Sequence, residues 1–307
     1  MNLSPGLTGV FKEDIRFIGN YRRQWHSVPV SYLTFSGAVD MKFFHRKLRS
    51  GFLAGGILFN RDQAGDSEYS LTQLALSGSY THQVGENNLL TLGVQLGGGQ
   101  RSIQPGGLTF GNQFNGDIFV ATLDTRENFT SENTSFSDIS TGLNWHLQQE
   151  DQLFWLDLGF GLFHLTEPQV SFYNEPDSKL ARRMSFYGMG GVKLNAKMDL
   201  VGHIIYQKQG PRSEGIGGTA IRYRFIEQRG KEMAVQFGTS YRFLGVNDAF
   251  IPAVEIHFAS WRCGFSYDVN LSDFNLATNK NGGPELALIY TITKVKPVGT
   301  FKACPIF

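Results

Sequence analysis

The chain has 307 residues, 18% of them charged, and a formal net charge of +1, while glycine (36) and phenylalanine (26) are abundant. Because the charge is close to zero, the chain offers no basic field for nucleic acid, and we expect no nucleic-acid partner. It holds no run of about 18 apolar residues, which excludes a transmembrane helix. Its two cysteines, Cys263 and Cys304, are too few for a disulfide framework.

Along the chain, segments in which apolar and polar residues alternate follow one another, while helical spacing of apolar residues is hard to find. Residues 90–97 are a clear case, because leucine and valine alternate there with Thr91, Gly93, Gln95 and Gly97. A strand with this period has one face in an apolar medium and one in a polar medium. The pattern predicts strands over 15–27, 31–44, 51–60, 69–83, 88–101, 135–148, 152–165, 184–194, 197–209, 216–227, 231–245, 249–259, 261–271 and 284–294.

The expected connections fall into a long group and a short group that alternate along the chain. The long ones include RDQAGDSE, residues 102–134, residues 166–183, GPRSEG and residues 272–283, and the short ones include VGEN, QED, NA and QRG. The connections at 28–30 and 245–248 are short where a long one is expected. Such sorting is typical of a membrane barrel, which has short periplasmic turns and long external loops. We therefore predict an all-β fold, a single transmembrane outer-membrane β-barrel of about fourteen antiparallel strands.

The inward-facing rows of this predicted barrel carry charges of both signs, among them Asp40, Arg222, Arg242 and Asp268. Such charges are costly in a sandwich core unless each is paired, whereas in a barrel lumen they meet water or one another. The same charges leave undecided whether the lumen is open or plugged. We divide the chain into an N-terminal periplasmic lead-in (1–14), the transmembrane β-barrel (15–294) and a C-terminal periplasmic tail (295–307).

Several stretches are more specific than the alternating pattern. They are NLSPGLTGVFKEDIRFIGNYRRQWHSVPVSYLTFSGAVD at the start, LTFGNQFNGDIF (108–119), GFGLFHLTEPQVSF (159–172), SYDVNLSDFNLATNKNGGPELALIY (266–290) and the terminal ACPIF. In this order they resemble the landmarks of the PorP/SprF family of outer-membrane proteins, and the resemblance covers essentially the whole chain. The sequence departs from the family pattern at Ser4–Pro5–Gly6, where the family has Asn–Pro–Ala, and at Ile306, where a basic residue is usual.

This resemblance implies an integral outer-membrane protein of the type IX secretion system of Bacteroidota, in a family some of whose members serve gliding motility. It implies a non-enzymatic barrel that receives or anchors a secreted cell-surface protein, such as a gliding adhesin, by its C-terminal domain. The implied partners are that protein with its type IX C-terminal signal domain, outer-membrane lipid, and periplasmic ring or peptidoglycan-binding components. Family members carry a signal peptide, so we expect Met1 to be an internal residue or an introduced start. The alternatives are a passive pore or solute transporter, and a structural link to periplasmic secretion-motor components.

Three stretches hold candidate partner-binding residues. They are Arg22, Arg23 and Trp25 in NYRRQW, then Gly111, Asn112, Gln113, Phe114 and Asn115 in the longest loop, and Phe163 and His164 before two Glu-Pro steps. Arginine forks bind carboxylates, so Arg22 suits an anionic or peptide group, and the alternative is a lumen salt bridge to Asp40 on the paired strand. The longest loop is either a plug or ligand-binding turn, or a folded cap on the barrel. The segment after Phe163 is either a rigid external loop or a contact surface.

Catalytic and metal sites are not indicated, and we expect no cofactor. Ser140, Asn144 and His146 share one inward face, but Ser140 and His146 are roughly 20 Å apart at about 3.3 Å per residue. A hydrolase would therefore need partners on neighbouring strands. No Cys/His pair has the spacing of metal ligands, and acidic calcium loops are absent. The C-terminal tail, with Pro297 and Pro305, either folds back as a plug or binds a periplasmic partner.

Overall fold

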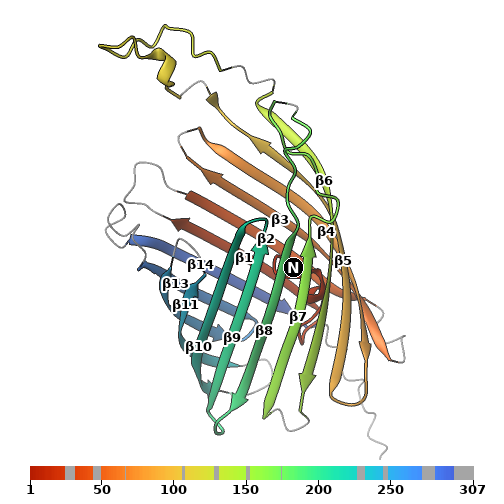
Figure 1. Cartoon of the computed structure of the whole chain (residues 1–307). Coiled ribbons are helices and arrows are strands. Elements are labelled where there is room, and N and C mark those ends of the chain that lie inside the picture. Colours follow the sequence, from red (N-terminus) through yellow and green to blue (C-terminus); the bar gives the residue numbers. More distant parts are fainter. Residues whose placement is uncertain are drawn as a thin grey trace, which may run out of the picture.

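A computed structural model (Figure 1) describes the chain as one closed antiparallel barrel. The residues described are 1–24, 32–43, 50–65, 67–105, 108–127, 131–149, 153–173, 175–226, 232–244, 248–271 and 281–293. Within these ranges there are fourteen strands, each paired with the next, and β1 closes the ring against β14, with Ile15 opposite Ile292 and Arg22 opposite Glu285. The prediction of a fourteen-stranded antiparallel barrel is confirmed.

The strands follow the predicted order, with most ends within a few residues of the expected ones. They are β1 (Ile15–Gln24), β2 (Tyr32–Phe43), β3 (Gly51–Ala64), β4 (Tyr69–Gln83), β5 (Asn88–Ser102), β6 (Asn133–Gln148), β7 (Phe154–Phe163), β8 (Arg183–Lys193), β9 (Met198–Gln209), β10 (Arg212–Ile226), β11 (Met233–Phe243), β12 (Ala249–Phe258), β13 (Trp261–Asn270) and β14 (Asn281–Ile292). None of the helical segments in the described ranges is long and apolar enough to cross a membrane.

The two faces of the strands have opposite chemistry, and the apolar face points outward. On β5, the leucine and valine side chains between positions 90 and 96 are 44–56% exposed, whereas Thr91 is 0% and Gln95 9% exposed. A protein dissolved in water would bury the apolar row and expose the polar one. Large apolar rows that surround a polar interior are instead the pattern of a barrel in lipid. The apolar medium predicted for one face of each strand is therefore outside the barrel wall.

The two longest connections lie at the same end of the barrel, as predicted, which distinguishes a long-loop end from a short-turn end. Residues 103–132 and 164–182 connect strands at the long-loop end, whereas residues 84–87 and 194–197 connect strands at the short-turn end. Two expected long connections are wrong. RDQAGDSE (61–68) was expected to be a loop, but residues 61–64 belong to β3 and pair with β4, so only residues 65–68 separate the two strands. GPRSEG was expected to be a loop, but only Gly210 and Pro211 separate β9 from β10, because Arg212 pairs directly with Gln209. Gly210 takes a left-handed φ of 55°, which suits a tight hairpin turn.

Several charged side chains inside the barrel are paired with one another. Arg16 binds Asp40 with its Nη2 2.7 Å from Oδ2, and Arg242 binds Asp268 at 2.9 Å. Arg224 likewise pairs with Asp199. Pairing across neighbouring strands lowers the cost of holding these charges away from bulk water. The mixed-sign charge of the inward rows therefore forms a network along the lumen wall.

An N-terminal segment, residues 2–11, lies inside the barrel against the inner faces of β3 to β7 (Figure 1). It includes one turn of 3-10 helix, η1 (Pro5–Leu7), which Ser4 caps by accepting a hydrogen bond from the backbone N–H of Gly6. The sequence suggested a periplasmic lead-in for residues 1–14, and these contacts place most of that stretch within the lumen instead. Small residues on the facing strands make the space for it.

Hydrogen bonds fix the N-terminal segment to several strands. They join Ser4 Oγ to the Phe160 carbonyl (2.9 Å), Thr8 Oγ1 to Ser77 Oγ (2.6 Å), Ser79 Oγ to the Thr8 carbonyl (2.7 Å) and the Gly9 N–H to Asp40 Oδ2 (2.8 Å). Asp40 thus serves Arg16 and the N-terminal segment at once, and its side chain is fully buried. The segment is part of the folded interior rather than a loose tail.

Candidate functional site

Of the first candidate group, Arg22 belongs to the lumen network and not to an open site. Its Nη2 lies 2.5 Å from Asp268 Oδ2 on β13, and its Nε lies 3.7 Å from a Glu285 oxygen on β14. The expected alternative, a salt bridge from Arg22 to Asp40, is wrong, because the β1–β2 register places Asp40 opposite Arg16 and Thr34 opposite Arg22. Arg22 therefore has carboxylate partners within the chain.

The other two members of this group are not brought to the same place. Arg23 alternates with Arg22 along β1 and shares the outward side with Tyr21, so the two arginines cannot bind one group. Trp25 lies outside the described residues. NYRRQW therefore does not form a single recognition site in the part of the chain that the structure describes.

The loop between β5 and β6 projects beyond the strand ends at the long-loop end (Figure 1). It contains a 3-10 turn, η3 (Gly111–Gln113). Gln113 is buried and holds the loop together, since its Oε1 accepts from the Phe110 N–H at 2.9 Å and its Nε2 donates to the Ala121 carbonyl at 3.1 Å. In Figure 1 the described part of the loop lies beyond the strand ends and does not enter the lumen, so it does not form a plug.

The remaining loop candidates complete this small folded unit. Asn112 Nδ2 donates to the Thr125 carbonyl at 3.1 Å, and Asn115 Oδ1 accepts the backbone N–H of Ile118 at 2.9 Å. Phe114 pairs with Phe119 in an isolated β-bridge. The polar side chains are used inside the unit, while four large apolar side chains point to the surface. Those side chains are Phe114, Ile118, Phe119 and Leu123.

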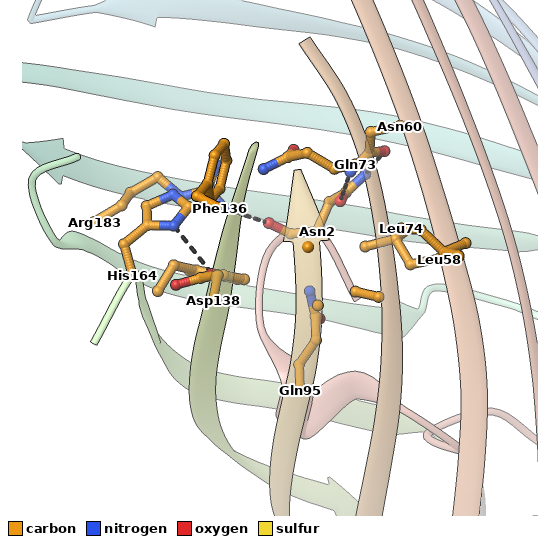
Figure 2. Close-up of a pocket in the computed structure, with 14 residues that line it drawn as sticks. Asn2, Leu58, Asn60, Gln73, Leu74, Gln95, Phe136, Asp138, His164 and Arg183 are labelled. Carbon is orange, nitrogen blue, oxygen red and sulfur yellow. Dashed lines mark hydrogen bonds and ion pairs between the residues drawn. The ribbon is translucent and has the colours of Figure 1, made fainter. Parts of the chain in front are cut away.

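Phe163 and His164 lie at the end of β7 beside a small pocket of about 80 Å³ in the lumen (Figure 2). Phe163 is buried beneath the Arg183 guanidinium, whose carbon is 4.1 Å from the ring centre. His164 has a left-handed φ of 58°, and its Nδ1 lies 3.0 Å from Asp138 Oδ2. The conformation of His164 turns the chain into the loop while keeping the ring in the pocket wall.

The geometry of Ser140, His146 and His164 does not build a hydrolase. Ser140 Oγ donates to Asp138 Oδ2 at 3.1 Å, and His164 binds the same oxygen at 3.0 Å. In a serine hydrolase the histidine lies between the serine and the acid, whereas here Asp138 lies between Ser140 and His164. His146 is engaged with Asp157 at 3.0 Å. Among the described residues, no group of three or more metal-ligating side chains is arranged to hold a metal ion.

Sequence reasoning missed most of the pocket that Phe163 and His164 border. Asn2, Gln95, Asp138 and Arg183 also line it, and they come from four separate parts of the chain. Each is an ordinary polar residue at an inward position of its strand or segment. No local motif marks them, because the closure of the barrel and the position of the N-terminal segment bring them together.

Comparisons with solved structures support the fold. The Ralstonia pickettii toluene transporter TbuX aligns with a TM-score of 0.54 at 11% identity, over 94% of this chain and 92% of that chain. A Pseudomonas aeruginosa FadL homologue aligns with a TM-score of 0.52 at 10% identity, over 94% and 92%. A TodX deltaS2S3 mutant, a monoaromatic hydrocarbon channel, reaches 0.55 at 10% identity, over 93% and 91%. At such identities the likeness concerns the fold alone.

At the sequence level, none of the curated proteins matches the chain. The profile of one family, described as type IX secretion system membrane protein PorP/SprF, matches residues 1–290. This match covers nearly the whole chain, including the N-terminal segment, the strands and the long loops. The chain belongs to the PorP/SprF family of type IX secretion system membrane proteins and is an outer-membrane β-barrel.

Proposed function

We propose that this barrel receives or anchors a secreted cell-surface protein during type IX secretion, and that the β5–β6 loop is its contact surface. One observation carries the proposal: a loop folded around buried Gln113 presents Phe114, Ile118, Phe119 and Leu123 to the surface beyond the barrel rim. Exposed apolar side chains on a rigid support are typical of surfaces that bind proteins. Because the chain belongs to a family of type IX secretion system membrane proteins, such a partner would be a protein that this system exports.

The closed barrel argues for capture by the loop rather than by addition of a strand. β1 and β14 are paired from Ile15 opposite Ile292 to Arg22 opposite Glu285, so this seam offers no free edge to an incoming strand. Strand addition would have to break these backbone hydrogen bonds first. A folded C-terminal domain of the partner, docking on the apolar loop, needs no such opening.

A role as a transporter of apolar solutes has less support. Three of the proteins of similar fold are a toluene transporter and two monoaromatic hydrocarbon channels by their names. The lumen of this chain is instead lined by ion pairs such as Arg242–Asp268 and contains the N-terminal segment. A polar, charged interior is a poor path for an aromatic hydrocarbon.

The test combines a loop variant with recovery of the partner from the native outer membrane. Phe114→Ser with Phe119→Ser removes two exposed aromatic rings, and Leu271→Ser removes an equally exposed side chain from a different loop as the matched control. Tagged barrels are purified in mild detergent, and co-purified proteins that carry a type IX C-terminal signal domain are identified by mass spectrometry. The amount of the same proteins on the cell surface is measured in parallel.

We expect the parent and Leu271→Ser barrels to retain such a protein, and the double variant to lose at least about tenfold of it, as for loss of a hot spot. Equal recovery with all three barrels contradicts the loop as contact surface. Recovery of only periplasmic ring or peptidoglycan-binding proteins contradicts the receptor role and supports the structural link. A barrel that purifies alone and conducts steadily in planar bilayers supports the pore.

A further inference from the structure

The lipid-facing wall of the barrel carries very few charged side chains, and they share one sign and one end. Within the described strands, the outward positions hold three Lys or Arg residues and no Asp or Glu residue. The three are Arg23 on β1, Arg61 on β3 and Lys208 on β9. They alternate along their strands with outward side chains that are 42–57% exposed, such as Tyr21, Ile57 and Ile204. β1, β3 and β9 all run toward the long-loop end, and each cation lies within three residues of the end of its strand.

Arg23 and Arg61 lie at the depth where lipid headgroups begin. Arg23 is one outward position beyond Tyr21 on β1, and Arg61 is one outward position beyond Phe59 on β3. Aromatic side chains near the ends of barrel strands form girdles at the membrane–water interface. A cation just beyond such a girdle costs little free energy and meets the headgroups, whereas a charge at the middle of the wall would face hydrocarbon.

The pairing of β1, β2 and β3, which are neighbours in Figure 1, brings the two arginines near each other. On β2, Leu33 pairs with Arg23 and Phe35 pairs with Arg61. One strand and two residues therefore separate the arginines, which places their Cα atoms roughly 12 Å apart. Two extended arginine side chains can reach one group between them. Lys208, in contrast, has no second outward cation on the described parts of β8 or β10.

The charges of Arg23 and Arg61 are not neutralised by the described part of the chain. Neither side chain has an ion pair or a hydrogen bond there, whereas the inward Arg16 and Arg242 both bind carboxylates. The counter-charge of the outward pair has to come from outside the chain, and at this depth the available anions are lipid headgroups. Guanidinium groups bind phosphate oxygens through two parallel N–H···O bonds, which makes arginine well suited to this role.

Next to the two arginines, toward the middle of the membrane, the outer wall has a depression. Gly19 and Gly37 pair directly on the outward face of β1 and β2. A Cβ added at Gly19 would meet nothing within 4 Å, and one at Gly37 would meet only the Phe35 ring, at 3.8 Å. Leu288 and Phe59 lie opposite these glycines on the flanking strands. An acyl chain can lie in this depression while its headgroup contacts the arginines.

We propose that the outer wall of β1 to β3 binds a membrane lipid with an anionic phosphate headgroup, held between Arg23 and Arg61 in the outer leaflet. The phosphate oxygens accept hydrogen bonds from both guanidinium groups, and an acyl chain covers Gly19 and Gly37. A headgroup without an ammonium group fits best, because the outward face of the described strands offers no carboxylate to pair with one. This site is separate from the β5–β6 loop and does not depend on the proposed function.

The first test measures lipid binding to the purified full chain in detergent micelles by native mass spectrometry. The probes are dioleoylphosphatidic acid and dioleoylphosphatidylcholine, which have the same acyl chains, but the second neutralises its phosphate with its own ammonium group. We expect phosphatidic acid to bind at least about tenfold more tightly. Excess inorganic phosphate should not displace it, because the free ion lacks the acyl chains. Equal binding of the two lipids, or displacement by inorganic phosphate, overturns the lipid assignment.

Variants connect this binding to the two arginines. Arg23→Gln combined with Arg61→Gln removes both guanidinium groups, and Lys208→Gln is the matched control because it removes an outward cation at the same end of another strand. The affinity for phosphatidic acid should fall at least about tenfold in the double variant and stay unchanged in the control. If the double variant does not fold, the two single variants replace it, and each should lose part of the affinity. Unchanged affinity in every folded arginine variant, or an equal loss in Lys208→Gln, overturns the site.

Two further probes identify the source of the phosphate. Phosphorylated lipid A and its dephosphorylated form are compared with phosphatidic acid on the parent barrel and on the double variant. Phosphate-dependent binding of lipid A that is lost in the double variant supports the site with a glycolipid as its ligand. Binding of phosphatidic acid alone supports the site with a phospholipid as its ligand. If the affinity of neither lipid depends on its phosphate, the proposal is overturned.

Discussion

Gly93 on β5 lies directly opposite Gly142 on β6, and together they leave the space in which Pro5 of the N-terminal segment packs. A Cβ added at Gly93 would lie 2.2 Å from the Pro5 carbonyl oxygen, and one at Gly142 would lie 3.0 Å from Pro5 Cδ. Gly161 on β7 continues the row opposite Gly142. The lumen holds the N-terminal segment at the place where three neighbouring strands present no side chain.

The first prediction is that Gly93→Ala displaces the N-terminal segment from the wall without opening the barrel. The added methyl group must occupy the position of the Pro5 carbonyl, at a cost of about 1–3 kcal/mol for overpacking. Ser4→Cys reports the displacement, in a background where Cys263 and Cys304 are serine, through labelling with a membrane-impermeant maleimide. Ser4 is fully buried in the parent protein, so labelling should become fast only in Gly93→Ala.

Gly78→Ala is the matched control for this experiment, because a Cβ at Gly78 meets nothing within 4 Å. It should label as slowly as the parent. Equal labelling of Gly93→Ala and Gly78→Ala would show that the segment does not depend on the glycine row.

The second prediction concerns the lumen that the N-terminal segment occupies. Deleting residues 2–10 removes the groups hydrogen-bonded to Ser77, Ser79 and Phe160 and leaves the β1–β14 seam intact. Because a fourteen-stranded ring encloses a wide interior, we expect the steady conductance in planar bilayers to rise about twofold or more. Unchanged conductance would mean that the ion-paired side chains close the lumen by themselves.

The strands and their faces were predictable from the sequence because each strand carries its own period of two. The outward leucines around Leu92 and the inward Thr91 and Gln95 are distinguished by position alone, whatever the strand pairs with. Lipid outside and polar groups inside make this signal strong. The family landmarks then matched the secretion-system profile over residues 1–290.

Contacts between residues on different strands could not be predicted in the same way. The pairing of Arg16 rather than Arg22 with Asp40 depends on the β1–β2 register, which the turn sets and the alternation does not. The Gln95–Asp138–Arg183 pocket depends in addition on the placement of the N-terminal segment. Gly93, Gly142 and Gly161 can be read in the sequence, but their alignment in one row depends on the strand register, and nothing in them indicates which segment fills the space beside them.

The third prediction concerns the β5–β6 loop, whose shape depends on one buried side chain. Gln113→Ala removes the hydrogen bonds to Phe110 and Ala121 and should loosen the loop by about 1–3 kcal/mol. Trypsin cleavage after the exposed Arg126 should then become about tenfold faster, because cleavage follows the population of the opened loop. Gln104→Ala, at an exposed glutamine near the start of the loop, should cleave like the parent. Similar rates for both variants would contradict the structural role of Gln113.

The last prediction concerns the lumen network at β1, β11 and β13. Asp268 Oδ2 accepts from Arg22 and Arg242 at 2.5 and 2.9 Å, and its side chain is only 2% exposed. Asp268→Asn leaves two guanidinium groups short of a counter-charge in the wall, and we expect the free energy of unfolding to fall by about 3 kcal/mol. Urea unfolding of the refolded barrel in lipid measures the change. The control is Glu167→Gln, whose Arg182 partner is 53% exposed and 3.4 Å away, and it should cost no more than about 0.5 kcal/mol. If both variants lost the same free energy of unfolding, water in the lumen would screen the charge of Asp268 as strongly as solvent screens the exposed Glu167.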